Sequence, residues 1–151
     1  MKNQIVRRSA LIVTLVALLS SLALSATGQE MMGKMGKMNR KGTPTVAIIR
    51  ADWCTVCQKL EPAMAELMEE YKGRLNFVIL DVSNEEKTVE AAATARKLGL
   101  GKFFEANKKK TSTVAIFGVK NKVLFQKHYD TNRETFARAL EDAARKGGRR
   151  S

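Results

Sequence analysis

Cysteine, histidine, proline and tryptophan are scarce in this chain, and the shortage excludes several classes of protein. Two cysteines occur in 151 residues, with one histidine, two prolines and one tryptophan. A small secreted protein held together by several disulfides needs about four or more cysteines, so this fold must be stabilised mainly by a packed core. A structural zinc site needs about four ligands, which this composition does not supply. We therefore expect no metal and no cofactor, and interpret His128 as a surface or core residue.

Acidic residues are also in short supply, with 15 Asp and Glu against 27 Lys and Arg, which gives a formal net charge of +12. Such a charge raises the question of a nucleic acid or an anionic membrane as partner. The basic residues are scattered, and aromatic residues do not alternate with them as a base-stacking surface requires. The composition thus predicts no nucleic-acid binding and leaves open a weak association with an anionic membrane surface.

Residues 1–28 have the pattern of an export signal. Three basic residues within the first eight precede an uncharged run at 9–29, and small residues follow its apolar part. This arrangement is typical of a cleaved signal peptide. The run is also long enough for an uncleaved N-terminal membrane anchor. Both interpretations place the rest of the chain outside the cytoplasm, in the periplasm or secreted.

Residues 29–42 are rich in Met, Gly and Lys and lack apolar periodicity, which is typical of a flexible linker. Met32, Met35 and Met38 recur at every third position. Because thioethers are soft ligands suited to Cu(I), they allow a second function, copper binding together with the two cysteines. A low-complexity tether is the simpler explanation of the same composition.

Apolar periodicity over residues 43–147 predicts strands alternating with helices, followed by a basic tail at 148–151. Strands are expected at 45–50, 75–82, 114–117 and 123–125, and helices at 56–71, between 83 and 98, near 103–107 and from 131 to 146. Two of the helices begin with the spacing of a capping box, Ser83 with Glu86 and Thr131 with Glu134. A strand, crossover helix and strand make a parallel pair, and the final hairpin adds antiparallel strands. The order therefore predicts a mixed sheet with helices on both faces.

The two cysteines lie close together in RADWCTVCQKLEP, at residues 50–62. Cys54 falls where a strand gives way to a helix, and the unpaired N–H groups of a helix start stabilise a thiolate. Cys57 lies one helical turn later, near enough to form a disulfide with Cys54. We therefore predict a redox-active disulfide, with Cys54 as the nucleophile and Cys57 as the resolving thiol. A static bridge in a redox-silent interaction domain is the alternative.

Residues 51–57 (ADWCTVC), with Pro62 five positions after Cys57, resemble the active site of the thioredoxin family, and so does the order of elements over 43–147. The resemblance implies an α/β thioredoxin-like three-layer fold. Because few residues precede the first strand, we expect a mixed central sheet of about four strands, without the strand and helix that open a full-length thioredoxin. It further implies that Cys54 is exposed at the strand-to-helix turn and that Trp53 covers the site.

The resemblance also implies an activity. A thioredoxin-like thiol-disulfide oxidoreductase exchanges disulfides with protein substrates, and we expect a protein-disulfide reductase. Its partners would be protein thiols and disulfides. An exported reductase also needs electrons from a membrane or exported redox partner.

One departure from the family pattern concerns the residue that faces the cysteines. The family usually carries a cis-proline there, just before a strand, and the aligned position is Ser112, preceded by Thr111. Neither of the two prolines in the chain can fill it. We expect Thr111 and Ser112, with Trp53 and Pro62, to support the site or contact substrate.

Two further departures concern the surroundings of Cys57. The buried acid that many thioredoxins place beneath the resolving cysteine aligns with Ile48, and its basic neighbour aligns with Phe77. Cys57 would then lose its proton to water or to Glu61. The segment 99–112 is longer than its usual counterpart, and we expect this loop to contribute to partner selectivity.

Overall fold

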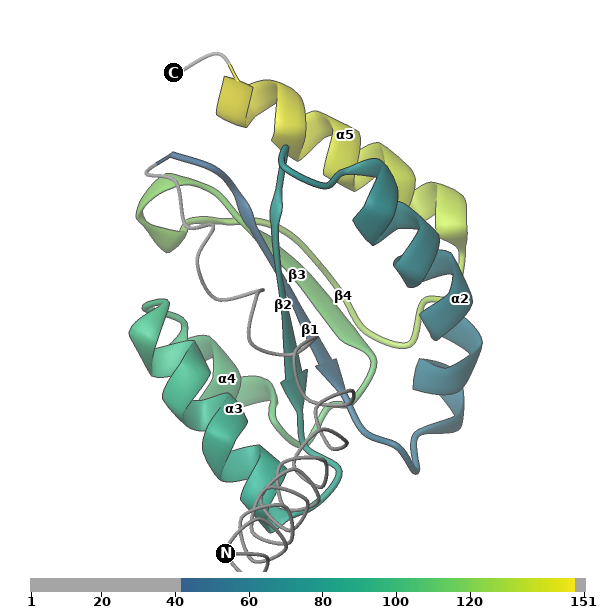
Figure 1. The fold of residues 1–151 in the computed structure, drawn as a ribbon, viewed down its shortest axis with the longest axis vertical. Coiled ribbons are helices and arrows are strands. Elements are labelled where there is room, and N and C mark those ends of the chain that lie inside the picture. The colour runs from purple at the N-terminus through teal and green to yellow at the C-terminus, as the bar shows by residue number, and fades with distance from the viewer. Residues whose placement is uncertain (1–41, 149–151) are drawn as a thin grey trace, which may run out of the picture. The chain divides into compact units, whose positions relative to one another are not determined.

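The structure, a computed structural model, describes residues 42–148. The predicted leader, nearly all of the predicted linker and the last three residues of the predicted tail lie outside the described residues. The elements in chain order are β1 (Thr45–Arg50), α2 (Thr55–Glu70), β2 (Asn76–Asp81), α3 (Glu85–Lys97), α4 (Gly101–Asn107), β3 (Thr113–Phe117), the 3-10 turn η2 (Val119–Asn121), β4 (Val123–Lys127) and α5 (Arg133–Gly148) (Figure 1). Within 42–148 no helix is long and apolar enough to span a membrane.

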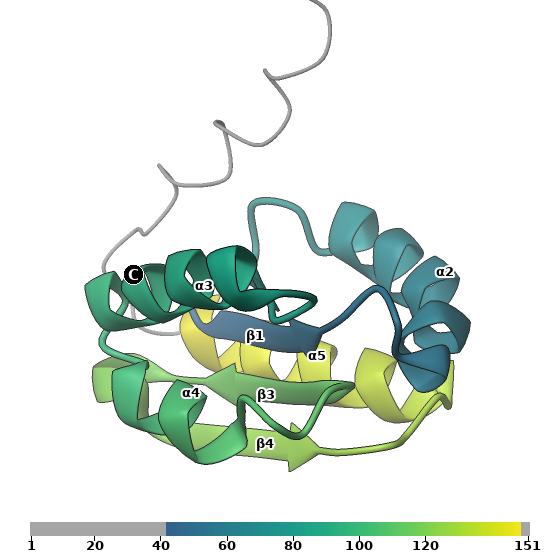
Figure 2. The same cartoon turned by 90° about the horizontal axis from the view of Figure 1, so that it is seen from below.

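The four strands form one mixed sheet in the order β2-β1-β3-β4. Strand β1 pairs in parallel with β2. It pairs antiparallel with β3, and β3 pairs antiparallel with β4 (Figure 2). The predicted four-stranded mixed sheet is therefore confirmed. Because β1 is an inner strand, its last residue and the turn that follows it have a neighbouring strand on each side at this end of the sheet.

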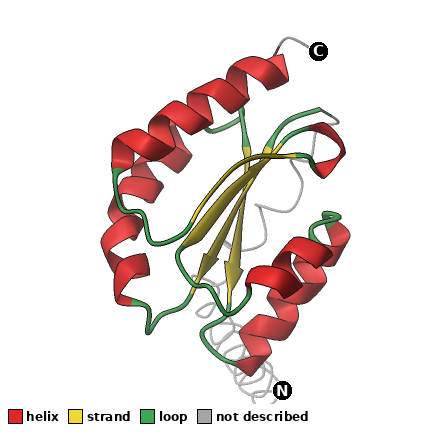
Figure 3. Cartoon of the chain, turned by 180° about the vertical axis from the view of Figure 1, so that it is seen from behind, coloured by secondary structure: helices red, strands yellow, loops and turns green. Residues whose placement is uncertain are grey.

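Helices cover both faces of the sheet, as the order of elements predicted. Figure 3 shows the sheet between two helical layers. Successive strand residues point to opposite faces, so alternate side chains of β1 enter different cores. Val46 and Ile48 pack in the core beneath α2 and α5, whereas Ala47 and Ile49 pack in the core beneath α3 and α4. The apolar run of β1 is continuous in sequence because this strand is buried on both sides.

The start of α3 differs from the prediction by one residue. Asn84 is the N-cap, and its side-chain oxygen accepts the N–H of Lys87 at 2.8 Å. The predicted capping box of Ser83 with Glu86 is wrong, because asparagine is as good an N-cap as serine and lies one position closer to the helix. The hydroxyl of Ser83 is used at the candidate site instead.

The start and end of α5 show similar differences. The side-chain oxygen of Asn132 accepts the N–H groups of Glu134 and Thr135 at 2.9 and 3.2 Å. Asn132 therefore caps the helix, and the predicted box that begins at Thr131 is wrong for the same reason. The helix extends to Gly148, two residues beyond the predicted end at 146.

Candidate active site

The turn between β1 and α2 places the first sulfur atom at a helix start. Cys54 is the N-cap of α2, with φ −85° and ψ 103°. Its Sγ accepts the N–H of Cys57 at 3.1 Å, and its own N–H donates to the carbonyl of Ala51 at 3.1 Å. A sulfur in this position lies at the positive end of the helix dipole and has a hydrogen-bond donor. The predicted position of Cys54 at a strand-to-helix junction is confirmed.

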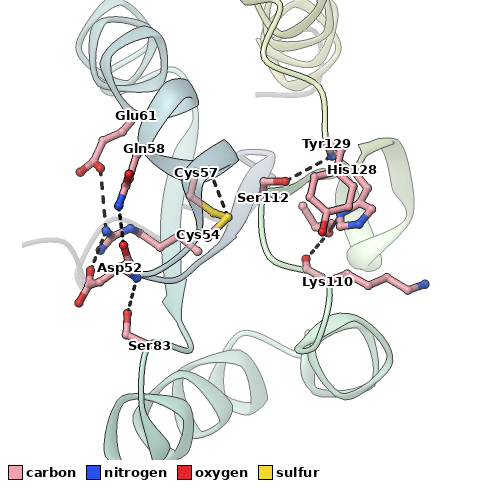
Figure 4. The surroundings of a disulfide bond; sticks show 12 residues. Asp52, Cys54, Cys57, Gln58, Glu61, Ser83, Lys110, Ser112, His128 and Tyr129 are labelled. Atoms are coloured by element: carbon pink, nitrogen blue, oxygen red, sulfur yellow. Dashed lines mark hydrogen bonds and ion pairs between the residues drawn. A yellow bond between two sulfur atoms is a disulfide. The ribbon is translucent and has the colours of Figure 1, made fainter.

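Cys54 and Cys57 form a disulfide, with their Cα atoms 5.2 Å apart (Figure 4). Ala51 and the partly buried Val56 and Val82 pack around it. Each cysteine is only 5% exposed, so the expectation that Cys54 would be exposed is wrong. Apolar side chains from the turn after β1, the first turn of α2 and the turn after β2 cover the bond, and the sequence did not indicate that Val82 would be one of them. An uncharged disulfide is favoured in such surroundings over a thiolate.

Trp53 lies at the rim of the site. Its side chain is 64% exposed, and its ring N–H donates to the carbonyl of Ser83 at 3.1 Å. This hydrogen bond fixes one edge of the indole against the turn after β2 and leaves most of the ring to solvent. An anchored, exposed tryptophan is suited to contact with a protein partner. Its roles in covering the disulfide and in binding substrate stay predictions.

Charged and polar side chains join the motif turn to the turn after β2. Because β1 and β2 are parallel, Arg50 lies opposite Asp81, and their side chains pair at 3.2 Å. Lys87 from α3 pairs with Asp81 at 3.3 Å and with Asp52 at 2.9 Å. The Ser83 hydroxyl accepts the N–H of Asp52 at 2.8 Å and donates to Asp81. We call these five residues the turn network. It ties the backbone just before Cys54 to β2 and α3.

No sequence motif predicted a role for most of this network. A signal was present, since Arg50 and Asp81 end two strands that were predicted to be parallel neighbours. The contacts of Asp52 with Lys87 were not predictable, because they depend on how α3 lies against the sheet. Gln58 adds a further tie, with its side-chain amide donating to the carbonyl of Asp52 at 2.7 Å.

The turn network shifts the pKa values of its ionisable members. The hydrogen bond from Lys87 lowers the pKa of Asp52, and it outweighs partial desolvation. Desolvation is the largest effect on Asp81 and raises its pKa, but hydrogen bonds from Ser83 and Lys87 together lower it overall. The hydrogen bond to Asp52 raises the pKa of Lys87. The ionised form of each group is therefore stabilised by the fold.

Replacing Lys87 by glutamine is expected to raise the pKa values of both Asp52 and Asp81. In the native protein these values lie below the ordinary 3.8, so the two carboxylates stabilise the fold above that pH and lose their contribution as the pH falls through the folded values. Lys87 has a pKa above the ordinary 10.5 and loses its contribution as the pH rises through the folded value. NMR titration of the two carboxyl carbons is the measurement. The exposed Lys97, also on α3, provides the control Lys97→Gln, and unchanged carboxyl titration in Lys87→Gln would contradict the network.

Ser112 lies opposite the disulfide, in the turn before β3 (Figure 4). It is 1% exposed, and its hydroxyl accepts the N–H of Tyr129 at 3.3 Å. Both residues have left-handed backbones, with φ 61° at Ser112 and φ 57° at Tyr129. Thr111 is also buried, at 4% exposure. The structure thus brings Cys54, Cys57 and Ser112 together, while substrate contact by Thr111 and Ser112 stays a prediction.

Other residues named from the sequence do not belong to the apolar cluster around the disulfide. Pro62 lies inside α2 and is exposed, outside the cluster around the disulfide. The Glu61 carboxylate points toward Arg50, 3.9 Å away, and no hydrogen bond joins it to Cys57 in the part of the chain that the structure describes (Figure 4). Ile48, at the position of the family's buried acid, is a core residue at 7% exposure. Cys57 therefore has no carboxylate partner among residues 42–148.

Metal binding receives no support from the described part of the chain. Between residues 42 and 148 no group of three or more His, Cys, Asp or Glu side chains is arranged to hold a metal ion. His128 is half-buried, and its Nδ1 atom lies 3.1 Å from the hydroxyl of Thr113. Met32, Met35 and Met38 lie outside the described residues, so copper binding through them stays a hypothesis.

Comparison with known proteins connects this site to a family. The sequence pattern of the thioredoxin family matches residues 35–124. A solution structure of a thioredoxin-like protein in the oxidized form has a TM-score of 0.51 and 13% identity, over 69% of this chain and 79% of that one. That similarity supports the fold.

Several curated proteins are similar over shorter stretches. The thioredoxin-like protein HCF164, chloroplastic, of Oryza sativa is 42% identical over 66 residues, which cover 44% of this chain and 23% of that protein. The thiol:disulfide interchange protein TxlA homolog of Synechocystis is 47% identical over 45 residues, 30% of this chain and 25% of that protein. The thiol:disulfide interchange protein TxlA of Synechococcus elongatus is 31% identical over 96 residues, 57% of this chain and 48% of that protein. The matched parts of this chain span from about a quarter to about half of the length of these relatives.

Proposed function

Because the chain belongs to the thioredoxin family, we propose that it is a thiol-disulfide oxidoreductase that exchanges disulfides with protein substrates through Cys54 and Cys57. The observation that carries this proposal is the geometry at the start of α2. The Cys54 sulfur accepts the N–H of Cys57 at 3.1 Å and is bonded to the Cys57 sulfur in a small ring. The names of two relatives, thiol:disulfide interchange proteins, support the same chemistry.

The reaction moves two electrons from the cysteine pair to a substrate disulfide. In the reduced protein the Cys54 thiolate attacks one substrate sulfur, which forms a mixed disulfide and releases the other substrate sulfur as a thiolate. The Cys57 thiolate then attacks the Cys54 sulfur, which forms the intramolecular disulfide and releases the second substrate sulfur. Solvent supplies the protons taken up by the released thiolates. The substrate is reduced, and the cysteine pair ends in the bonded form described above.

The burial of the disulfide supports the reductase direction. The bond is surrounded by Ala51, Val56 and Val82, and each cysteine is 5% exposed. Desolvation disfavours a thiolate more than an uncharged disulfide. Stabilising the oxidised form of a dithiol lowers its reduction potential and makes the reduced form a better electron donor. The hydrogen bond to the Cys54 sulfur stabilises its thiolate and therefore raises the reduction potential. A measurement of the potential shows which of the two effects is larger.

We place the working domain outside the cytoplasm. Residues 1–28 supply an export signal or an anchor, residues 29–42 a linker, and residues 43–147 the thioredoxin-like domain, before the basic tail. A reductase in that location needs electrons from a membrane or exported redox partner. The name of the Oryza sativa relative describes that protein as chloroplastic.

The equilibrium potential of the Cys54 and Cys57 pair is expected to lie near that of thioredoxin, about −270 mV. Thiol labelling of the full chain across glutathione buffers measures it. Cys54→Ser, which cannot form the intramolecular bond, is the control for labelling efficiency. A potential near about −120 mV would contradict the reductase direction. A pair that never exchanges with the buffer would contradict the oxidoreductase itself.

A further inference from the structure

The end of the domain opposite the cysteines exposes aliphatic side chains. Val119, Val123 and Leu124 are 44%, 49% and 37% exposed, and they come from η2 and β4. Figure 1 shows η2 at the end of the domain where β1 begins, while the turn that carries Cys54 follows the other end of β1. At about 3.3 Å per residue, a strand of this length separates the two ends by roughly 20 Å. A partner bound at this end would therefore leave the disulfide accessible.

Lysines surround these aliphatic side chains. Lys122 and Lys146 line a groove of about 380 Å³ together with Val119 and Leu124. Lys120 follows Val119 in the η2 turn and is exposed. We call the set of Val119, Lys120, Lys122, Val123, Leu124 and Lys146 the hairpin-end patch.

The lysines of the hairpin-end patch are not neutralised. Within residues 42–148, none of the three forms an ion pair. The acids of nearby segments are already paired: Glu69 with Lys72, Glu141 with Arg74, and Asp142 with Arg145. The positive charge of this end is therefore available to an anionic partner.

The tip of the patch is held in a defined shape. Lys120 and Asn121 both have left-handed backbones, with φ 57° and 55°. The Asn121 side chain donates to the carbonyl of Leu98 at 3.1 Å, which ties the tip to the end of α3. Two exposed basic residues, Arg96 and Lys97, lie beside that contact. Consecutive left-handed residues that are not glycine are strained, and such strain is more common at functional surfaces than elsewhere.

We propose that the hairpin-end patch docks on an anionic membrane surface, with phosphate-bearing lipid headgroups meeting its lysines. Aliphatic side chains that enter the headgroup boundary, flanked by lysines, are the combination that binds such surfaces. A nucleic acid fits less well, because the patch has no aromatic side chain on which a base could stack.

The course of the chain favours the same partner. Gly42 lines the groove, so the chain arrives at the hairpin-end patch from residues 1–41. The uncharged run at 9–29, predicted to meet a membrane, is joined to it by residues 30–41. Twelve residues reach at most about 40 Å, so a membrane that holds the run keeps this end of the domain within that distance. Docking there directs Cys54 and Cys57 away from the lipid, toward soluble proteins.

Tryptophan quenching by brominated lipids tests this orientation in the full chain. The single tryptophan, Trp53, reports on the cysteine end, and Leu124→Trp in a Trp53→Phe background reports on the patch. With vesicles of brominated phosphatidylglycerol and phosphatidylcholine, we expect strong quenching of the Leu124→Trp reporter and little quenching of Trp53. Val123→Trp in the same background is a second reporter, should Leu124→Trp disturb the hairpin.

Charge variants distinguish quenching caused by docking of the hairpin-end patch from quenching caused by insertion of residues 9–29, because they change only the lysines of the patch. Removing three lysines with Lys120→Gln, Lys122→Gln and Lys146→Gln is expected to lower the affinity for the vesicles by about 100-fold, since each lysine near an anionic surface contributes about fivefold. Quenching of the reporter should then fall to the level of Trp53. The matched control is Lys59→Gln, Lys109→Gln and Lys110→Gln, which removes the same charge elsewhere and should leave quenching unchanged.

Three results would overturn the proposal. The first is quenching of the patch reporter no stronger than that of Trp53. The second is equal quenching with purely zwitterionic phosphatidylcholine vesicles, or quenching that the patch variants do not reduce. The third is release of the patch from the vesicles by a single-stranded polynucleotide at equal phosphate concentration, which would make the patch a nucleic-acid site.

Discussion

Replacing Cys57 with serine is expected to trap a mixed disulfide between Cys54 and a substrate protein, whereas Cys54→Ser is expected to abolish exchange. The asymmetry follows from the start of α2. The Cys54 sulfur receives the N–H of Cys57, and the structure gives the Cys57 sulfur no such donor among the described residues. Charge on sulfur is therefore better stabilised at Cys54, which makes it the attacking group. The loss in Cys54→Ser should be at least about 1,000-fold, as is usual when a covalent nucleophile is removed.

Reduction of insulin disulfides in the presence of dithiothreitol measures the loss, and non-reducing electrophoresis detects the trapped species. The matched control for both variants is Lys97→Gln, an exposed change on α3 away from the disulfide. A second readout is alkylation of the fully reduced protein by iodoacetamide, in which Cys54 should react before Cys57. Trapping through Cys57 in the Cys54→Ser protein, or equal alkylation of the two thiols, would reverse the assignment of roles.

The fold was predictable because its main signals are local. The run at 45–50 is apolar and β-branched, and its alternate residues fill two cores in the structure. The helix after Cys54 presents Leu60, Met64 and Leu67 at helical spacing, and all three are buried. Short connections between such segments leave few ways to pair the strands. The helix starts were misplaced by one residue because two adjacent polar residues compete to cap the same helix.

The surroundings of the disulfide were less predictable because they depend on contacts between distant segments. Asp52 and Lys87 are 35 positions apart in sequence and meet through the packing of α3 on the sheet. Val82 covers the disulfide from the turn after β2, a contact that no motif encodes. The motif indicated which atoms react. It could not indicate that those atoms would be 5% exposed.

Restoring the family's proline with Ser112→Pro is expected to destabilise the protein by about 3 kcal/mol or more. Ser112 has φ 61°, whereas the proline ring fixes φ near −65°. The turn would have to change its course while its neighbours remain buried. The substitution also removes the hydroxyl that accepts the N–H of Tyr129 at 3.3 Å. The midpoint of urea unfolding of the oxidised protein is the measurement.

Ser112→Gly separates the backbone effect from the lost hydrogen bond. Glycine adopts a left-handed backbone freely, which relieves about 1 kcal/mol of strain, and loss of the hydrogen bond costs about the same. Its stability should therefore stay within about 1 kcal/mol of the native value. If Ser112→Pro were as stable as Ser112→Gly, the left-handed turn would not be required by the fold. With both stabilities as expected, the turn facing the disulfide requires a left-handed backbone at Ser112, a conformation that excludes proline in the place where the family uses one.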